Sequence, residues 1–176
     1  MPAAEEPAVA VFGSSDPAEA DEGYAVAREV GRRLAEAGYT VANGGYGGTM
    51  EASARGAVEA GGHTVGVTCS CWAAAPNAYI RQVVETATLA ERLERLARLG
   101  RAGFVALPGA TGTLVELAWV WEGMLKGLMP RLPLVCVGEF WRPLVERIAL
   151  VRPDSARIVR VIGSPAELAD PFPPRR

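Results

Sequence analysis

The sequence is poor in three residue types that carry much protein chemistry. It has one lysine, Lys126, and one histidine, His63, among 176 residues. Three cysteines are too few for the disulfide framework of a small secreted fold, and with one histidine they form no convincing zinc site, so no metal is expected. Cys69 and Cys71 stand too close for an ordinary disulfide, and small buried residues at a strand end are expected there.

Long apolar runs and an excess of positive charge are also missing. No apolar run approaches the ~20 residues of a membrane span, and no basic region followed by an apolar core marks a signal peptide. Lys+Arg 18 against Asp+Glu 20 gives a net charge of −2, which offers no broad basic field to nucleic acid. A cytoplasmic protein without membrane or nucleic-acid partners is expected.

What the sequence does contain is a regular alternation of strands and helices. Short apolar runs predict strands over 8–12, 39–42, 63–68, 80–86, 103–107, 132–137 and 157–162. Apolar positions spaced by three and four predict helices over 17–38, 49–60, 89–99, 113–127, 140–149 and 164–169. This order predicts one doubly wound, Rossmann-like α/β domain over residues 1–176, with a parallel sheet covered on both faces. Residues 1–7 are expected to form a loose tail, and 151–176 the last strand and a short helix.

Three loops are expected at one edge of this sheet, over 13–15, 43–48 and 108–112. Ligands of such sheets bind beyond the carboxyl ends of the strands, where the strand order reverses. The stretch Leu107-Pro-Gly-Ala-Thr-Gly-Thr-Leu-Val-Glu116 leads from a strand into a helix, so free backbone N–H groups and the helix dipole favour an anion there. Thr111 and Thr113 add hydroxyl donors, which suits a phosphate. The alternative is an ordinary turn with a solvated carboxylate.

The two glycine-rich loops, over 43–48 and 108–112, differ from the common nucleotide-binding motifs. Neither is followed by the Lys-Ser or Lys-Thr of a P-loop, and Gly13-Ser-Ser15 stands where a G-x-G-x-x-G motif would follow the first strand. NAD binding is therefore disfavoured, and a mononucleotide with one phosphate fits better.

Arg92 stands out among the arginines of the helix expected over 89–99. Glu91 lies four residues before Arg95, and Glu94 lies four before Arg98, so both of those arginines have expected helical partners. Arg92 has no acid three or four residues away, which makes it a candidate for a phosphate or substrate contact. A solvated surface arginine is the alternative.

Glu116 belongs to a helix that is apolar almost all round. Such a helix is buried on more than one side, and a second subunit is expected to cover 113–127. Burial would raise the pKa of Glu116 and the helix N-terminus would lower it, and we expect an ionised carboxylate near neutral pH. Beside a ribose it could stabilise an oxocarbenium-like transition state or orient a water; otherwise it only stabilises the helix.

Two motifs resemble the Lonely Guy (LOG) family, long labelled "possible lysine decarboxylase". Pro108-Gly-Ala-Thr-Gly-Thr-Leu-Val-Glu116 is similar to the family's P-G-G-x-G-T-x-x-E, and Asn43-Gly-Gly-Tyr-Gly-Gly-Thr-Met-Glu51 to its G-G-G-x-x-G-L-M-G. Val11-Phe-Gly-Ser-Ser15 and the Glu91-Arg92 pair also resemble family segments. Four departures, at Ala110, Asn43, Thr49 and Glu51, resemble a divergent branch with nucleotide- or molybdenum-cofactor-binding members.

The resemblance implies hydrolysis of the N-glycosidic bond of AMP or a cytokinin riboside monophosphate, without a cofactor, in a homodimer or larger homo-oligomer. It implies catalytic roles for Arg92 and Glu116. The expected phosphate- and nucleotide-binding residues are Gly13, Ser14, Gly44, Gly45, Gly47, Gly48, Thr49, Pro108, Gly109, Ala110, Thr111, Gly112 and Thr113. A carrier or sensor without turnover is the alternative. A pyridoxal-phosphate decarboxylase is rejected, because the only lysine, Lys126, lies far from this edge.

Overall fold

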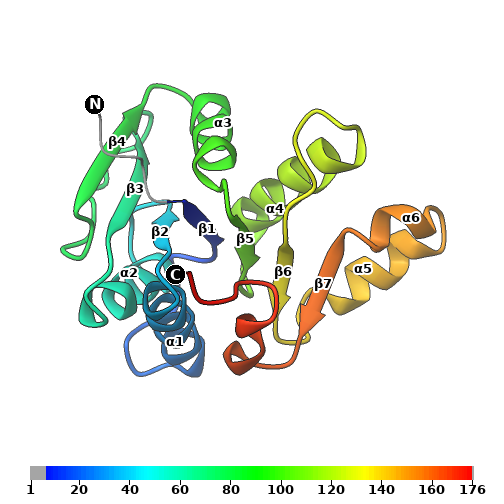
Figure 1. Cartoon of the computed structure of the whole chain (residues 1–176). Helices are drawn as coiled ribbons and strands as arrows, with labels where there is room; N and C mark the ends of the chain where they lie inside the picture. Colours follow the sequence, from blue (N-terminus) through cyan, green and yellow to red (C-terminus); the bar gives the residue numbers. More distant parts are fainter. Residues whose placement is uncertain (1–6, 176) are drawn as a thin grey trace.

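A computed structural model describes residues 7–175, which form one seven-stranded parallel sheet with helices on both faces (Figure 1). The expected tail over 1–7 lies, apart from Pro7, outside the described residues. The strands are β1 (Ala8–Phe12), β2 (Thr40–Asn43), β3 (Thr64–Cys69), β4 (Gln82–Thr86), β5 (Gly103–Ala106), β6 (Leu134–Val137) and β7 (Val159–Ile162). The helices are α1 (Glu22–Glu36), α2 (Thr49–Glu59), α3 (Leu89–Leu99), α4 (Thr111–Leu125), α5 (Arg142–Ala149), α6 (Pro153–Ala156) and the 3₁₀ helix η1 (Pro165–Ala169).

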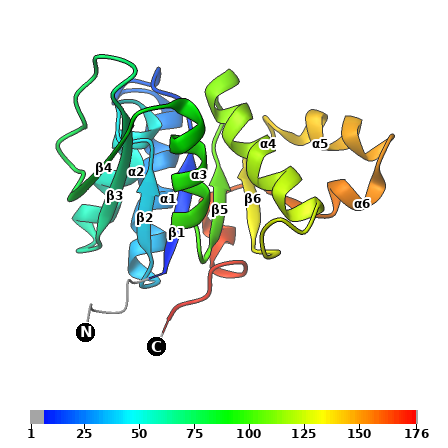
Figure 2. The same cartoon turned by 90° about the horizontal axis from the view of Figure 1, so that it is seen from above.

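The continuous apolar strands of the centre are buried on both faces, as the prediction of a doubly wound fold requires. Every residue of β1, β2, β3, β5 and β6 is buried. Val9 and Val11 of β1 pack in a cluster with residues of α1, α2 and η1, whereas Ala10 and Phe12 pack with residues of α3, α4 and α5. Figures 1 and 2 show α3 and α4 together on one face, with α1 and α2 opposite. The predicted fold class is confirmed.

The strand order places the reversal point of the sheet between β1 and β5. The order is β4-β3-β2-β1-β5-β6-β7, so the chain builds outward from β1 in one direction and then from β5 in the other. Phe12 at the end of β1 pairs with Ala106 at the end of β5, and the Leu107 N–H donates to the Phe12 carbonyl at 2.9 Å. The loops after β1 and β5 therefore leave the sheet side by side, where ligands of such folds bind.

Several element boundaries differ from the prediction. The helix α3 begins and ends as predicted, and its N-cap Thr88 accepts a hydrogen bond from the Glu91 N–H. The helix predicted over 113–127 begins two residues earlier, at Thr111, so Glu116 lies beyond its first turn. The short helix α6 was not predicted. None of the helices in residues 7–175 combines the length and apolar character that crossing a membrane requires.

The prediction for the first two cysteines is wrong. Cys69 and Cys71 form a disulfide, and their Cα atoms are 5.3 Å apart, within the usual range of ~4.4–6.8 Å. The pairing is possible because β3 ends at Cys69 and the chain turns immediately afterwards. Cys69 is buried as expected, but Cys71 is exposed. Cys136 is a buried free thiol in β6.

Candidate functional site

A cavity of about 700 Å³ opens at the carboxyl edge of the sheet, beside the ends of β1 and β5. This volume falls within the ~300–1,000 Å³ typical of small-molecule sites. Four loop or helix-start segments and α3 supply its walls. The lining residues are Gly13, Ser14, Ser15, Asp16, Tyr46, Met50, Trp72, Ala74, Leu89, Arg92, Leu93, Ala110, Thr111, Gly112, Thr113, Val115 and Glu116.

The N-terminus of α4 forms one wall of the cavity. Its cap residue, Ala110, has an extended backbone and no side-chain hydrogen bond to the helix. The N–H groups of Thr111, Gly112 and Thr113 have no helical acceptor, since the first intrahelical bond of α4 runs from the Leu114 N–H to the Ala110 carbonyl. Gly112 faces open space, because a Cβ added there would meet no atom within 4 Å. This wall can therefore bind an anion through backbone N–H groups and the helix dipole.

A buried ion pair joins α3 to α4 at the floor of the cavity. Arg92 Nη1 donates to Glu116 Oε1 at 3.0 Å, and Arg92 Nε donates to the Val67 carbonyl at 2.8 Å. Arg92 and Glu116 are only 6% and 7% exposed. The structure thus brings together two residues that the sequence analysis selected separately, and it shows that Arg92 is not a solvated surface arginine.

The prediction that Arg95 and Arg98 pair with acids on their own helix is wrong. Among the described residues, no ion pair joins Glu91 to Arg95 or Glu94 to Arg98. The Glu91 carboxylate instead accepts a hydrogen bond from the Ala87 N–H, just before α3 begins. Arg92 lacks an acid on its own helix because its partner, Glu116, is supplied by the neighbouring helix.

The environment of Glu116 changes its protonation. Burial raises its pKa from 4.5 to about 7, and the attraction and hydrogen bond of Arg92 oppose this rise only in part. Glu116 is therefore not fully ionised at neutral pH, contrary to the expectation. Glu116 Oε2 has no hydrogen-bond partner among the described residues. Every side-chain N or O atom of these residues that is fully shielded from solvent does have a partner, so Glu116 Oε2 is not fully shielded. That oxygen therefore reaches the cavity.

The glycine-rich loop over 43–48 supports the cavity through packing. The Asn43 side chain donates to the Met50 carbonyl at 2.8 Å and accepts from the Gly45 N–H at 2.8 Å, which holds the loop against the start of α2. A Cβ at Gly44 would lie 1.9 Å from Arg92 Nη2, so only glycine lets the guanidinium pass. The Thr49 hydroxyl donates to the Ser14 carbonyl at 3.0 Å, which links the loops after β1 and β2.

The predicted site residues divide into two groups. Those that line the cavity are Gly13, Ser14, Arg92, Ala110, Thr111, Gly112, Thr113 and Glu116. Those that do not line it are Gly44, Gly45, Gly47, Gly48, Thr49, Pro108 and Gly109, of which Pro108 is exposed. Thr49, by contrast, is 2% exposed and its hydroxyl is already used by Ser14.

Two aromatic residues of the cavity were missed. Tyr46 lies inside the glycine-rich loop. An aromatic residue between two pairs of glycines was a signal in the sequence that could have identified it. Trp72 lies in the loop after β3, which carries no helical or strand pattern. Both rings lie close to Arg92, whose Cζ is 5.8 Å from the centroid of Tyr46 and 5.7 Å from that of Trp72.

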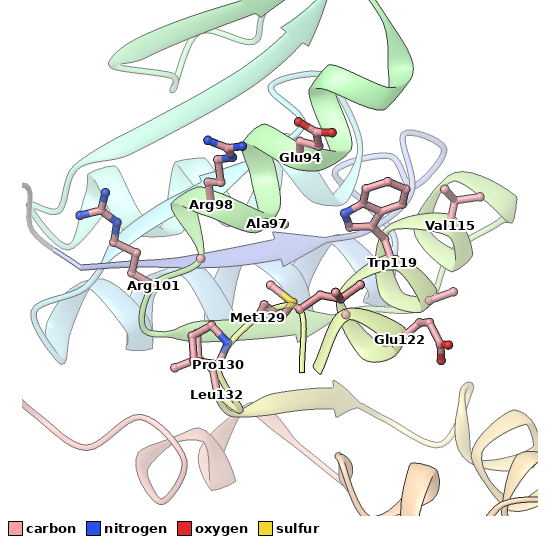
Figure 3. A pocket seen from close by; sticks show the side chains of 14 residues that line it. Glu94, Ala97, Arg98, Arg101, Val115, Trp119, Glu122, Met129, Pro130 and Leu132 are labelled. Atoms are coloured by element: carbon pink, nitrogen blue, oxygen red, sulfur yellow. The ribbon is translucent and has the colours of Figure 1, made fainter. Parts of the chain in front are cut away.

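A second hollow, of about 880 Å³, lies on the outer side of α3 and α4 (Figure 3). Its walls are mostly apolar, and Trp119, Met129 and Leu132 contribute to them. Figure 3 shows Arg98 and Arg101 at one end of this hollow and Glu122 at the other. Its lining includes neither the α4 N-terminus nor the Arg92–Glu116 pair, so the smaller cavity is the candidate functional site.

Comparison with known structures supports the fold. The molybdenum cofactor binding protein of Rippkaea orientalis is 20% identical with a TM-score of 0.77, covering 96% of each chain, which shows the fold alone. The molybdenum cofactor carrier protein of Chlamydomonas reinhardtii is 25% identical with a TM-score of 0.74, covering 94% of each chain. The structural-genomics target TM1055 is 28% identical with a TM-score of 0.70, covering 92% of this chain and 95% of the other.

Comparison of the sequence yields one short match and one long one. An uncharacterised protein of Archaeoglobus fulgidus is 49% identical over 47 residues, which is 27% of this chain and only 31% of the relative's length. The model of the SLOG cluster4 family matches residues 6–126, which include the Arg92–Glu116 pair and both glycine-rich loops. With well over half of its length matched, the chain belongs to the SLOG cluster4 family.

Proposed function

We propose that the chain is a nucleoside 5′-monophosphate phosphoribohydrolase, which hydrolyses the N-glycosidic bond of AMP or a cytokinin riboside monophosphate. The products are the free base and ribose 5-phosphate. The observation that carries the proposal is that a free oxygen of Glu116 and the N-terminus of α4 open into the same cavity. A phosphate binder alone has no need of a buried carboxylate at that place.

The phosphate would bind at the start of α4. The free N–H groups of Thr111, Gly112 and Thr113 and the dipole of a helix of 15 residues stabilise negative charge there. Thr113 is buried and lines the cavity, and its hydroxyl has no partner among residues 7–175, so it too can donate to the ligand. The ribose would then lie toward Glu116, about one turn further along α4.

In the reaction, water adds to C1′ of the ribose while the bond from C1′ to the base nitrogen breaks, and the base leaves with a proton. Positive charge develops at C1′ and the ring oxygen, where the Glu116 carboxylate stabilises it or orients the water. Arg92 favours the ionised form of Glu116 and fixes its orientation at 3.0 Å. The similarity of 108–116 to the LOG motif P-G-G-x-G-T-x-x-E supports these roles.

The proposal is tested by incubating the protein with AMP at neutral pH and measuring adenine by chromatography. Wild type releases adenine, and Glu116→Gln lowers the rate by about a hundredfold or more, as expected when transition-state charge loses its stabilisation. Glu146→Gln is the matched control, because Glu146 is exposed on α5, outside the cavity. If Glu116→Gln releases adenine as fast as wild type, the assigned mechanism is wrong.

A second candidate is a carrier or sensor that binds a nucleotide or the molybdenum cofactor without turnover. The likeness to the Chlamydomonas reinhardtii carrier over 94% of both chains favours it, as do the departures from the LOG motif at Asn43, Thr49 and Glu51. Saturable binding of AMP or of the cofactor with no product over hours supports this candidate. Release of adenine contradicts it.

We also propose that the chain forms a homodimer through the outer face of α4. Val115, Trp119 and Leu128 are exposed there, at 42%, 44% and 83%, although apolar. A two-fold axis through the middle of the hollow would place Arg98 and Arg101 of one subunit near the partner's Glu122, with Glu94 the other acid of the hollow (Figure 3). Val115 also lines the smaller cavity, so a partner on this face would lie next to the functional site.

A further inference from the structure

Trp72 is a large apolar side chain in a place where water can reach it. It lies on the loop that follows β3 and is 40% exposed, yet it is part of the wall of the candidate site. The phosphate-binding wall at Thr111–Thr113 belongs to the same cavity. A ligand that fills the cavity would therefore contact both that wall and the indole.

Several contacts hold the chain on either side of Trp72. The Tyr46 hydroxyl accepts from the Cys69 N–H at 2.8 Å and donates to the Cys69 carbonyl at 3.3 Å. The Asn77 side chain donates to the Tyr46 carbonyl at 2.7 Å, and the disulfide of Cys69 and Cys71 closes the turn just before Trp72. Ordering the backbone that carries Trp72 before a ligand arrives lowers the entropic cost of binding to it.

The two rings and the buried cation form a cluster with a free side. The centroids of Tyr46 and Trp72 are 6.0 Å apart, and the guanidinium of Arg92 lies near both rings. A cation against an indole fixes the ring and contributes to its stability. The 40% of Trp72 that stays exposed is available to a flat ligand.

We infer that Trp72 determines specificity by stacking on the base of the nucleotide whose phosphate binds at Thr111–Thr113. This inference rests on the proposed function, because it assigns the base side of that ligand. Stacking is effective for any flat heteroaromatic ring, and a purine offers more area to the indole than a pyrimidine. The ligand class is therefore a purine 5′-monophosphate rather than a phosphosugar alone.

The competing explanation is that Trp72 only packs against Arg92. In that case its removal disturbs the Arg92–Glu116 pair, and every ligand of the cavity is affected alike. If instead Trp72 stacks on the base, its removal weakens the binding of AMP. The binding of ribose 5-phosphate stays unchanged, because ribose 5-phosphate has the phosphate and the ribose but no base.

The experiment measures the dissociation constants of AMP and ribose 5-phosphate by isothermal titration calorimetry for Trp72, Trp72→Ala and Trp72→Phe, all in the Glu116→Gln background, because an active protein would hydrolyse AMP during the titration. We expect Trp72→Ala to weaken AMP binding by about ten- to a hundredfold, with Trp72→Phe restoring most of the loss and ribose 5-phosphate unchanged in all three. Unchanged AMP binding in Trp72→Ala, or an equal loss for both ligands, overturns the inference and leaves the proposed function standing. A protein with Trp72 intact that binds neither ligand overturns both.

Discussion

At the residue scale, the Arg92–Glu116 pair has the largest energetic consequence in the site. Both partners are more than nine-tenths buried, and removing ions from water costs several kcal/mol. The cost is offset by the contact at 3.0 Å and by the hydrogen bond from Arg92 Nε to the Val67 carbonyl. Removing one partner would leave an uncompensated buried charge, at about 3–5 kcal/mol. Glu116→Gln keeps an oxygen that can accept from Arg92 but leaves the Arg92 charge unpaired, so its stability should be measured beside its activity.

The raised pKa of Glu116 predicts a pH dependence of stability. Between pH 4.5 and about 7 the folded protein holds a proton that the unfolded chain has lost, so this group's contribution to the free energy of unfolding falls as pH rises. Urea unfolding between pH 5 and 8 should show wild type losing stability relative to Glu116→Gln, with a slope of at most ~1.4 kcal/mol per pH unit. Glu146→Gln should run parallel to wild type. Parallel curves for Glu116→Gln would contradict the prediction.

At the scale of elements, the loop between β2 and α2 shows how one glycine allows a buried arginine. Gly44 has no positive φ, so its need for glycine is steric and not conformational. A Cβ there would stand 1.9 Å from Arg92 Nη2 and 2.5 Å from Met50 Sδ. Gly47, in the same loop, offers a contrast, because its Cβ would meet only the Ser15 carbonyl at 3.8 Å.

This contrast predicts that one alanine substitution lowers the stability and the other leaves it nearly unchanged. Gly44→Ala should lower the free energy of unfolding by about 1–3 kcal/mol, as overpacking does, and should displace the Arg92 guanidinium. Gly47→Ala should change it by no more than ~0.5 kcal/mol. Urea unfolding of both variants measures the difference. Equal stability of the two would mean that Arg92 moves away at little cost.

The three cysteines predict a pattern of thiol reactivity. Cys69 and Cys71 are joined, and burial of Cys136 raises the pKa of its thiol to about 12, so the thiolate that reacts is scarce. Native protein should show no fast-reacting thiol with Ellman's reagent. After mild reduction by a dithiol two thiols should react, and the third only on unfolding. A fast-reacting thiol before reduction would contradict the disulfide.

At the scale of the whole molecule, α4 separates two surfaces with different purposes. Its N-terminus and Glu116 face the cavity, while Trp119 and Glu122 face the outer hollow (Figure 3). Val115 lines both. A helix with apolar residues on nearly every side fits a position between a sheet and a second subunit.

The proposed homodimer predicts that one charge on this face separates the subunits. Trp119→Glu places a carboxylate in the apolar centre of the contact, and sedimentation velocity at micromolar concentration should show a monomer where wild type is a dimer. Leu150→Glu is the control, because Leu150 is 76% exposed at the end of α5 and does not line the hollow. A monomeric wild type would contradict the proposal, as would a dimeric Trp119→Glu.

Features set by neighbours along the chain were predicted correctly more often than features that depend on distant residues. The helix over Leu89–Leu99 follows from its spaced leucines, and the buried strands follow from short apolar runs, because both patterns are set by neighbours along the chain. Once those strands are parallel, their loops must meet at one edge, so eight of the predicted site residues line one cavity. Helix starts were less accurate: α4 begins at Thr111 without a side-chain cap, so no cap residue marked it.

The sequence predicted the doubly wound fold, which the structure confirms, and it singled out one edge of the sheet, Arg92 and Glu116 as a candidate site. Only the tertiary structure decided that these two residues are partners, 24 positions apart in the chain, and that Trp72 faces the same cavity. The physical reason is that such contacts depend on how α3 and α4 dock on the sheet. Docking follows from the shapes of whole packed faces, which no local pattern of residues records.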